Sequence, residues 1–309
     1  MTTVLITGAN AGLGKDAARQ MALRPEVGKV YLGVRNEAKG AAARQELEQV
    51  TGRKVFEVVR IDTSDLATVQ AAVASLDKID GVVLNAGGPG GASAGDKTSD
   101  GVTQAFAANV LGHVALVEGL IAADKLSGTV VNVSTEAVRG IPAMGMKRPE
   151  LPTSSVEDFV TVADGSRFDR FDPMVAYGYN KYVSTLWISA MARRYPDIRF
   201  VSVSPGATTG TNAADQVGAF QRFLFTKVFF PLFTLLGQAH GLEVGAKRYV
   251  DVLTDANYES GRFYASAWPS TSGKLVDQAP IWDDLTNETY QDNAHASLRR
   301  FLPTALQAA

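Results

Sequence analysis

The sequence predicts an α/β protein built on one doubly wound parallel sheet of about seven strands, with helices on both faces. Short β-branched runs alternate along the chain with longer stretches whose apolar residues recur every three to four positions, which is the pattern of strand–helix–strand units. Several strand runs, such as GVVLNA and GTVVNVS, are apolar at nearly every position, as expected for strands covered on both sides. No Pro/Ser-rich linker divides residues 1–309, so we expect one domain.

One helix is expected in each connection between the strands. The strands are expected at about 3–7, 29–34, 55–60, 81–85, 129–134, 199–204 and 262–266. The helices are expected to begin at Leu13, Glu37, Asp65, Asp100, Met174 and Glu243. Asp65 is the expected N-terminal cap of its helix, and residues 292–309 are expected to form a short amphipathic helix.

Two connections do not fit the simple alternation. An insertion at about 138–173 follows the fifth strand, and a helical segment rich in Phe and Leu at about 212–237 follows the sixth. Both leave the carboxyl ends of strands, where open α/β sheets bind ligands. Because pockets for small molecules are mostly apolar, these segments predict an apolar substrate side.

Composition excludes several classes of function. The 309 residues include 30 Lys+Arg and 32 Asp+Glu, for a formal net charge of -2, so a nucleic-acid partner is not expected. The absence of Cys excludes disulfides, thiolate metal sites and Cys nucleophiles, and His113, His240 and His295 share no ligand spacing, so no metal site is expected. Only Met1 and Thr2 precede the first apolar run. We therefore expect no targeting segment and a cytoplasmic location.

The stretch richest in apolar residues extends from Phe223 to Gly237. Lys227 and Pro231 interrupt this run, and it is shorter than a bilayer requires. No membrane span is therefore expected.

A glycine-rich turn follows the first strand. In TGANAGLG, the residues Gly8, Gly12 and Gly14 allow a tight turn, and a pyrophosphate can approach the N–H groups of the helix that follows. By spacing alone this is either a nucleotide-binding turn or a tight strand-to-helix connection. The end of the second strand, where an acidic residue would bind a ribose 2′-hydroxyl, holds Arg35. A guanidinium can bind a 2′-phosphate through two charged hydrogen bonds, so Arg35 favours NADP over NAD. The alternative is that Arg35 is only a solvated cation in a loop.

Tyr177 and Lys181 stand four residues apart on a predicted helix and so share one face. Hydroxyl groups end the fifth strand at Ser134 and Thr135, LNAGG ends the fourth, and Asn109 lies in the helix between them. The Tyr/Lys pair alone decides nothing. Together with the glycine turn, and in this order, the set resembles the short-chain dehydrogenase/reductase family over nearly the whole chain.

The resemblance implies a Rossmann-type fold and a role for each catalytic position. Tyr177 would be the general acid/base, and Lys181 would lower the pKa of its phenol and bind the nicotinamide ribose. Asn109 matches the proton-relay asparagine of the family. Thr135 stands where the family has its substrate-orienting serine, with Ser134 just before it as the second candidate hydroxyl.

The resemblance also implies the cofactor contacts. Asp62 would contact the adenine amino group, and Pro205 with Gly206 would lie beside the nicotinamide carboxamide. The full implied set for NADP(H) is Gly8, Asn10, Gly12, Leu13, Gly14, Arg35, Asn36, Asp62, Thr63, Asn85, Ala86, Gly87, Tyr177, Lys181, Pro205 and Gly206.

Within the family, the chain is most similar to a subgroup with retinol dehydrogenases and light-dependent protochlorophyllide reductases. The segments TGANAGLGK, NVLGH and EVGAKRYVDVLTDANYESGRFYAS carry this likeness. It implies an NADP(H)-dependent oxidoreductase that interconverts a carbonyl and an alcohol on a fairly apolar small molecule. His113 matches a helix position that serves packing.

Three other interpretations stay open at this point. STE followed by a distant Tyr-x-x-x-Lys is also found in nucleotide-sugar dehydratases and epimerases, a non-catalytic NADP-sensing regulator would keep the nucleotide site, and a structural scaffold would keep a vestigial one. The sequence leaves open whether the chain is a monomer or a homo-oligomer, and it does not indicate the natural substrate, the reaction direction or the stereochemistry.

Overall fold

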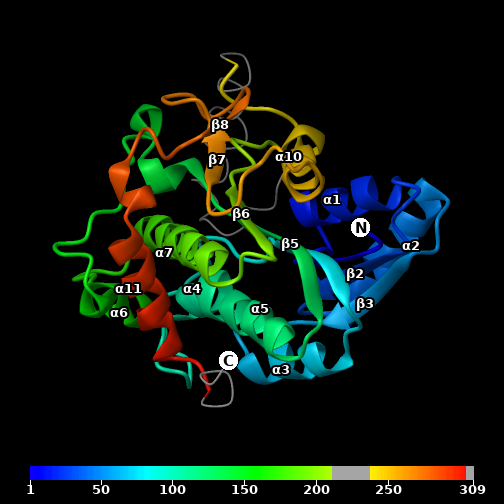
Figure 1. Ribbon diagram of the computed structural model, residues 1–309, viewed down its shortest axis with the longest axis horizontal. Helices are drawn as coiled ribbons and strands as arrows, with labels where there is room; N and C mark the ends of the chain where they lie inside the picture. Colours follow the sequence, from blue (N-terminus) through cyan, green and yellow to red (C-terminus); the bar gives the residue numbers. More distant parts are fainter. Residues whose placement is uncertain (211–236, 304–309) are drawn as a thin grey trace.

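A computed structural model describes residues 1–210 and 237–303 and contains one eight-stranded sheet. The strands are β1 (Thr3–Thr7), β2 (Lys29–Val34), β3 (Phe56–Arg60), β4 (Ile79–Leu84), β5 (Leu126–Val133), β6 (Arg199–Val203), β7 (Phe263–Ser266) and β8 (Leu275–Asp277). Their order is β3-β2-β1-β4-β5-β6-β7-β8 (Figure 1). The predicted fold class is confirmed, and its seven strands are parallel, with β8 added antiparallel to β7.

The strand order reverses between β1 and β4. The chain proceeds outward from β1 through β2 and β3, then returns to place β4 on the other side of β1. A crevice therefore opens at the carboxyl ends of these central strands, which is where open α/β sheets bind ligands. The glycine turn follows β1 and LNAGG ends β4, so the two meet at this point.

Helices fill every parallel crossover of which the structure describes the whole course. They are α1 (Gly12–Ala22), α2 (Glu37–Thr51), α3 (Leu66–Ser75), α4 (Gln104–Phe106), the π-turn η1 (Ala107–Leu111), α5 (Gly112–Ala122), α6 (Val156–Asp164), α7 (Pro173–Arg194), α10 (Leu242–Thr254) and α11 (Glu288–Arg299). Short 3-10 turns are η2 (Glu136–Arg139), η3 (Pro142–Met144) and η6 (Asp283–Thr286). As predicted, Asp65 caps α3 by accepting from the Ala67 N–H.

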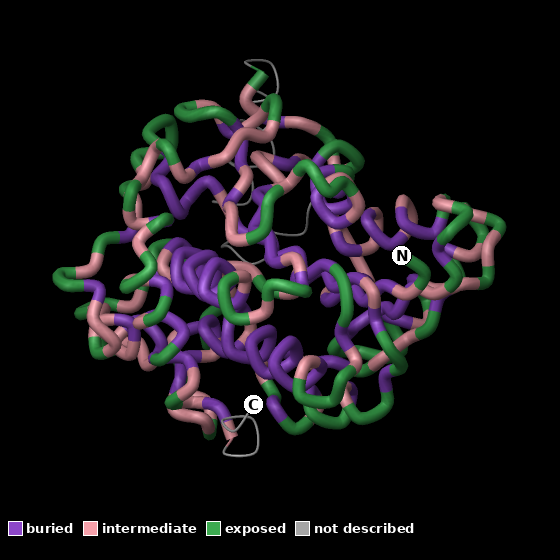
Figure 2. The backbone as a smooth tube through the Cα atoms, in the orientation of Figure 1, coloured by how far each residue is buried: buried purple, intermediate pink, exposed green. Residues whose placement is uncertain are grey.

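The helices form two layers around the sheet. α1, α2 and α10 lie on one face, and α3, α5 and α7 lie on the other, with α6 and α11 packed against α7 (Figure 1). Successive side chains of β1 point to opposite faces of the sheet, so each face has its own apolar core. Val4 and Ile6 belong to one hydrophobic cluster, and Leu5 belongs to the other. α5 and α7 are buried over most of their length (Figure 2).

The insertion after β5 contains η3 and α6, of which α6 was not predicted. The Ser155 side chain caps α6 by accepting from the Asp158 N–H at 3.2 Å. The C-terminal helix was predicted over 292–309 and instead begins at Glu288 and ends at Arg299, after Asn287 has capped it. The helical segment predicted at 212–237 lies outside the described residues, except for Gly237.

One helical run among the described residues, Gln104–Ala122, is long and apolar enough to cross a bilayer, with a hydropathy of 1.6. Of its most apolar 18-residue window, 83% is buried inside the fold, as in a helix of a protein core. Length and composition are therefore weak evidence for a membrane span here.

Candidate cofactor and catalytic site

The glycine turn wraps the end of β1 and leaves the start of α1 open. Gly8 and Gly12 adopt φ values of 67° and 55°, a region that residues with a Cβ rarely enter. The Gly8 N–H donates to Gly33 O at 2.8 Å, which ties the turn to β2. Ala11 precedes α1 without a side-chain cap, and the first turn of α1 has no acidic residue. The N–H groups at this helix terminus are therefore free of side-chain caps and suited to an anion.

Gly14 lets α1 pack directly on the end of β4. A Cβ at Gly14 would lie 2.5 Å from both Nδ2 of Asn85 and the carbonyl oxygen of Gly8. The Asn85 amide donates to Thr7 O at 2.8 Å and to Gly8 O at 3.4 Å. Asn85 thus holds the glycine turn in place and has a structural role besides any contact with a ligand.

A cavity of about 440 Å³ opens beside this turn. Its lining includes eight of the predicted cofactor or catalytic residues, namely Gly8, Asn10, Arg35, Asp62, Thr63, Ala86, Gly87 and Asn109. The lining also includes a run that the sequence analysis missed: Gly88, Gly90, Gly91, Ser93 and Ala94. The signal was present, because GGPGGASAG begins three residues after the end of β4 and small residues allow a ligand to approach the backbone.

Arg35 is an exposed cation on the rim of this cavity. Its guanidinium has no hydrogen bond or ion pair with any residue that the structure describes, so it is available to a ligand. Asn36, which is also predicted to bind the cofactor, caps α2 by accepting from the Lys39 N–H at 2.9 Å. Asp62 lines the cavity while it accepts from the Ser64 N–H at 3.0 Å and from its hydroxyl at 2.6 Å.

Leu13 and Thr63 each have a contact within the protein. A Cβ at Gly245 of α10 would lie 2.9 Å from Cδ2 of Leu13, so the Leu13 side chain packs toward α10. The Thr63 hydroxyl donates to Ala108 O at 3.0 Å. This bond joins the loop after β3 to η1. Neither contact requires a cofactor.

Asn109 lies in the π-turn η1, where the helical run from α4 to α5 is locally widened. Its Nδ2 donates to Ala105 O at 2.7 Å and to Gly88 O at 2.9 Å, and its Oδ1 accepts from the Gly88 N–H at 2.9 Å. A Cβ at Gly87 would lie 2.4 Å from Oδ1 of Asn109. The side chain therefore fixes the glycine-rich loop that lines the cavity.

His113 lies one helical turn further and is packed in the interior. Its Nε2 lies 3.1 Å from Oγ1 of Thr7. Burial and the nearby charge of Lys181 lower the pKa of His113 to about 3. The ring is neutral at physiological pH, in keeping with a packing role.

Tyr177 and Lys181 lie on α7 with their side chains adjacent, as their spacing predicts. Nζ of Lys181 lies 5.7 Å from the centre of the Tyr177 ring and donates to Val133 O at 2.8 Å. Burial lowers the pKa of Lys181 to about 8. Burial and the negative charge of Glu136 raise the pKa of Tyr177 to about 12. In the protein alone, the phenol is therefore protonated at neutral pH.

The two hydroxyls after β5 have different surroundings. Ser134 is buried, and its hydroxyl lies 2.9 Å from that of Thr185, which donates to Lys181 O at 2.7 Å. Thr135 is partly exposed, and its hydroxyl accepts from the Ala137 N–H at 3.3 Å as the cap of η2. Thr135 is therefore the more exposed of the two residues.

Pro205 and Gly206 leave β6 in a closely packed turn. Gly206 has a φ of 76°, and its N–H donates to the Ser204 hydroxyl at 3.0 Å. A Cβ there would lie 2.7 Å from Nη1 of Arg248 and 2.8 Å from Thr271 O. Within the described residues, the cavity lining stops at Asn109 and reaches neither this turn nor Tyr177. The predicted site is thus divided between an open half at β1–β4 and a packed half at β5–β7.

Comparison with known proteins identifies the group to which this arrangement belongs. The family model for short chain dehydrogenase matches residues 2–146, which include the glycine turn, Arg35, LNAGG and Asn109. The chain is a short-chain dehydrogenase/reductase. Members of this family are oxidoreductases that use nicotinamide cofactors.

Curated short-chain dehydrogenases and retinol dehydrogenases are similar in sequence. The chain is 30% identical over 215 residues to the short chain dehydrogenase FGM9 of Gibberella zeae, covering 66% of this chain and 61% of that protein. It is 30% identical over 202 residues to retinol dehydrogenase 12 of Mus musculus, covering 62% and 56% respectively. The matches thus span less than two thirds of these relatives. They place the chain in the retinol dehydrogenase-like branch of the short-chain dehydrogenase/reductases.

Solved structures of similar fold cover more of the chain. An uncharacterized protein from Mycobacterium paratuberculosis superposes with a TM-score of 0.70 over 97% of this chain and 93% of its own, at 23% identity. Salutaridine reductase from Papaver somniferum gives a TM-score of 0.62 over 85% and 99%, at 17% identity. At such identities the likeness concerns the fold, and it includes the carboxyl half that the family model leaves unmatched.

Proposed function

We propose that this short-chain dehydrogenase/reductase uses NADP(H) to interconvert an aldehyde or ketone and the corresponding alcohol, with Tyr177 as the general acid/base. The observation that carries the proposal is the placement of Tyr177 beside the buried ammonium of Lys181. The bond from Nζ to Val133 O fixes that ammonium at the end of β5. Thr135, the accessible hydroxyl, leaves the same strand two residues later.

These residues divide the work of carbonyl reduction. The cofactor, when bound, supplies the hydride. Tyr177, whose pKa is raised to about 12, holds a proton that it can give to the carbonyl oxygen. Lys181 places a positive charge next to the phenolate that remains and so stabilises it. Thr135 can donate a hydrogen bond to the same carbonyl oxygen and orient the substrate.

The residues around the cavity support the proposed preference for NADP. The uncapped start of α1 offers N–H groups to the pyrophosphate, and Arg35 presents an unpaired guanidinium on the same rim. A guanidinium forms two parallel charged hydrogen bonds with a phosphate but cannot accept one from a 2′-hydroxyl. Two groups that can bind anions, the start of α1 and Arg35, therefore lie beside the same cavity.

The surroundings of Glu136 weaken the dehydratase or epimerase alternative. In that reading, an acidic group beside Thr135 would act on the substrate. Glu136 is instead buried, and its carboxylate accepts from Ser204 and Ser266 and lies 3.9 Å from Nη1 of Arg248. A carboxylate engaged in this way is not free to abstract a proton from a substrate.

An apolar substrate is supported by side chains on the connections that leave the carboxyl edge. Met144 in the insertion, Met174 at the start of α7 and Trp268 after β7 are exposed. The relatives include retinol dehydrogenases, which are named for an apolar substrate, retinol. Large apolar side chains left open at a ligand-binding edge favour an apolar ligand.

The experiment is NADPH oxidation by the purified protein with aldehydes and ketones of graded hydrophobicity. We expect turnover that rises with the hydrophobicity of the carbonyl compound. Equal efficiency on small hydrophilic ketones would remove the apolar part of the proposal. Tight NADPH binding with no turnover on any compound would favour the sensor instead.

A further inference from the structure

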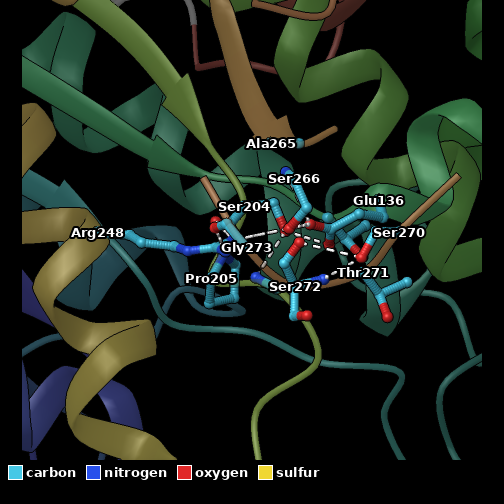
Figure 3. Close-up of polar contacts among 12 residues, drawn as sticks. Glu136, Ser204, Pro205, Arg248, Ala265, Ser266, Ser270, Thr271, Ser272 and Gly273 are labelled. Atoms are coloured by element: carbon cyan, nitrogen blue, oxygen red, sulfur yellow. Dashed lines mark hydrogen bonds and ion pairs between the residues drawn. The ribbon is translucent and has the colours of Figure 1, made fainter. Parts of the chain in front are cut away.

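A buried carboxylate joins the carboxyl ends of three neighbouring strands. Glu136 lies just after β5, Ser204 just after β6, and Ser266 ends β7. The Glu136 carboxylate accepts from the Ser204 hydroxyl, from the Ser266 hydroxyl at 3.1 Å and from the Ser266 N–H at 3.3 Å. Figure 3 shows these side chains converging on one another. Glu136 is only 3% exposed, so this charge is removed from solvent.

Arg248 of α10 completes the network from the other side. Its Nη1 lies 3.9 Å from Oε1 of Glu136 and donates to Ser204 O at 3.2 Å and to the Ser266 hydroxyl at 3.1 Å. Its Nη2 donates to Gly273 O at 2.7 Å (Figure 3). Buried ion pairs cost desolvation energy and add little to stability compared with apolar packing. Backbone pairing already joins β5, β6 and β7, so the network is not needed to hold these strands together.

The network surrounds the turn at Pro205 and Gly206. The Ser204 hydroxyl that donates to Glu136 also accepts from the Gly206 N–H at 3.0 Å. Nη1 of Arg248 is so close to Gly206 that a Cβ there would lie 2.7 Å from it. His240 supports the outer side, with Nε2 2.7 Å from Pro205 O. Glu136 also follows Thr135 directly, so one carboxylate connects the accessible hydroxyl to this turn.

We propose that Glu136 and Arg248 are positioning residues that hold the Pro205–Gly206 turn against the end of β5, and that they set the affinity of the nicotinamide half of the cofactor without affecting the adenosine half. The inference rests on the proposed function, because it assumes that a dinucleotide extends from the cavity to this turn. The adenosine half is separate in the structure, since its cavity is lined by the ends of β1–β4 and by α4 with η1. The charge of Glu136 also reaches the reacting group, because it raises the pKa of Tyr177.

The test compares two ligands by isothermal titration calorimetry. NADP⁺ occupies both halves of the site, whereas 2′,5′-ADP carries the 2′-phosphate and lacks the nicotinamide. Glu136→Gln keeps the shape of the side chain and one acceptor oxygen, and Arg248→Met keeps most of its length. We expect each to weaken NADP⁺ binding about tenfold or more, a change of about 1.4 kcal/mol, with 2′,5′-ADP affinity within about twofold.

Two further variants serve as a control and as a milder substitution. Lys247→Met removes the exposed neighbouring cation of α10, which pairs with Asp251, and is expected to change neither affinity. Ser266→Ala removes a single donor to Glu136 and is a milder change if a charge variant fails to fold. We expect it to weaken NADP⁺ about threefold and to leave 2′,5′-ADP unchanged.

The outcomes separate this inference from the function on which it rests. Failure of the wild-type protein to bind NADP⁺ would overturn both. Normal wild-type binding, with variants that lose both ligands equally or lose neither, would overturn the inference alone. Selective loss of NADP⁺ would establish it, and a rise in KM for NADPH larger than the fall in kcat would support it in turnover.

Discussion

The two halves of the ligand-facing edge are built in different ways. At the ends of β1–β4, glycine backbone surrounds a cavity, and Arg35 is exposed on its rim. At the ends of β5–β7, the groups are buried and charged, and they are joined across long stretches of chain. Glu136 and Ser266 are 130 residues apart in sequence, and Lys181 and Val133 are 48 apart.

This difference indicates how each half should respond to change. The open half has room for a ligand, and its exposed side chains can be replaced with little effect on the fold. In the packed half, Glu136 and Arg248 each have several partners, so replacing one of them disturbs the others. Binding of the adenosine half of the cofactor and catalysis can therefore be altered separately, and the following variants test the two halves.

The largest effect is expected at Tyr177, in the packed half. Tyr177→Phe removes the proton donor and should lower kcat/KM about 10³-fold, with NADPH affinity nearly unchanged. Steady-state kinetics and a binding titration on the same preparation measure both. Tyr179→Phe, two residues along the same helix, is the control and should cost less than about threefold. If Tyr177→Phe kept a tenth of the activity, Tyr177 would not be the acid.

Lys181 should make stability depend on pH in a defined direction. Its pKa in the folded protein is about 8 against an ordinary value of 10.5, so the charged form is disfavoured by folding. The full cost is present below pH 8 and disappears as the pH rises to 10.5. Relative to Lys181→Met, the wild-type free energy of unfolding should therefore increase by about 3 kcal/mol across that interval. Denaturant titrations at each pH measure it, and a constant difference would mean that the ammonium is not desolvated.

Two glycines in helices should respond to the same substitution with opposite signs. A Cβ at Gly14 would lie 2.5 Å from backbone and side-chain atoms, so Gly14→Ala should destabilise the fold by about 1–3 kcal/mol. The nearest atoms to a Cβ at Gly178 are 3.8 and 3.9 Å away. Gly178→Ala should therefore stabilise the protein by up to about 1 kcal/mol. Thermal unfolding of both variants decides the matter, and equal shifts would contradict the close packing of α1 on β4.

The smallest effects should separate the two hydroxyls after β5. Thr135→Ala should lower kcat/KM about tenfold with little loss of stability, because a donor to the substrate is lost. Ser134→Ala should cost about 1 kcal/mol of stability through its bond to Thr185, with activity nearly unchanged. The reverse result would assign substrate orientation to Ser134.

Local patterns in the sequence predict the open half well. The positions of the glycine turn and Arg35 are predictable because each directly follows a short strand of mostly apolar residues, TVLIT or KVYLGV. β5 begins at Leu126, earlier than predicted, because its pairing with β4 continues across an irregularity between Ile79 and Gly81. The strand β8 has three residues and no alternation, so no pattern marks it. α6 did carry a signal, since Ser155 is followed three residues later by Asp158.

The packed half was less predictable for a physical reason. Sequence spacing placed Tyr177 and Lys181 on one helical face, but it gave no sign that Glu136 would meet Ser266 and Arg248. Such contacts depend on which strands become neighbours, and this is decided by the packing of the whole sheet. For Asn36 and Leu13, the implied cofactor roles remain predictions, while the structure shows a helix cap and a contact toward α10.

The central claim is that the open half binds a 2′-phosphorylated dinucleotide, and calorimetry with NADP⁺ and NAD⁺ tests it most directly. We expect the wild-type protein to prefer NADP⁺. Arg35→Glu should weaken NADP⁺ by about 10–100-fold, or about 1.5–3 kcal/mol, and leave NAD⁺ nearly unchanged. Lys39→Glu, the same charge change on the neighbouring helix, should keep the preference. Equal wild-type affinities for the two dinucleotides, or the same loss in both variants, would contradict the account.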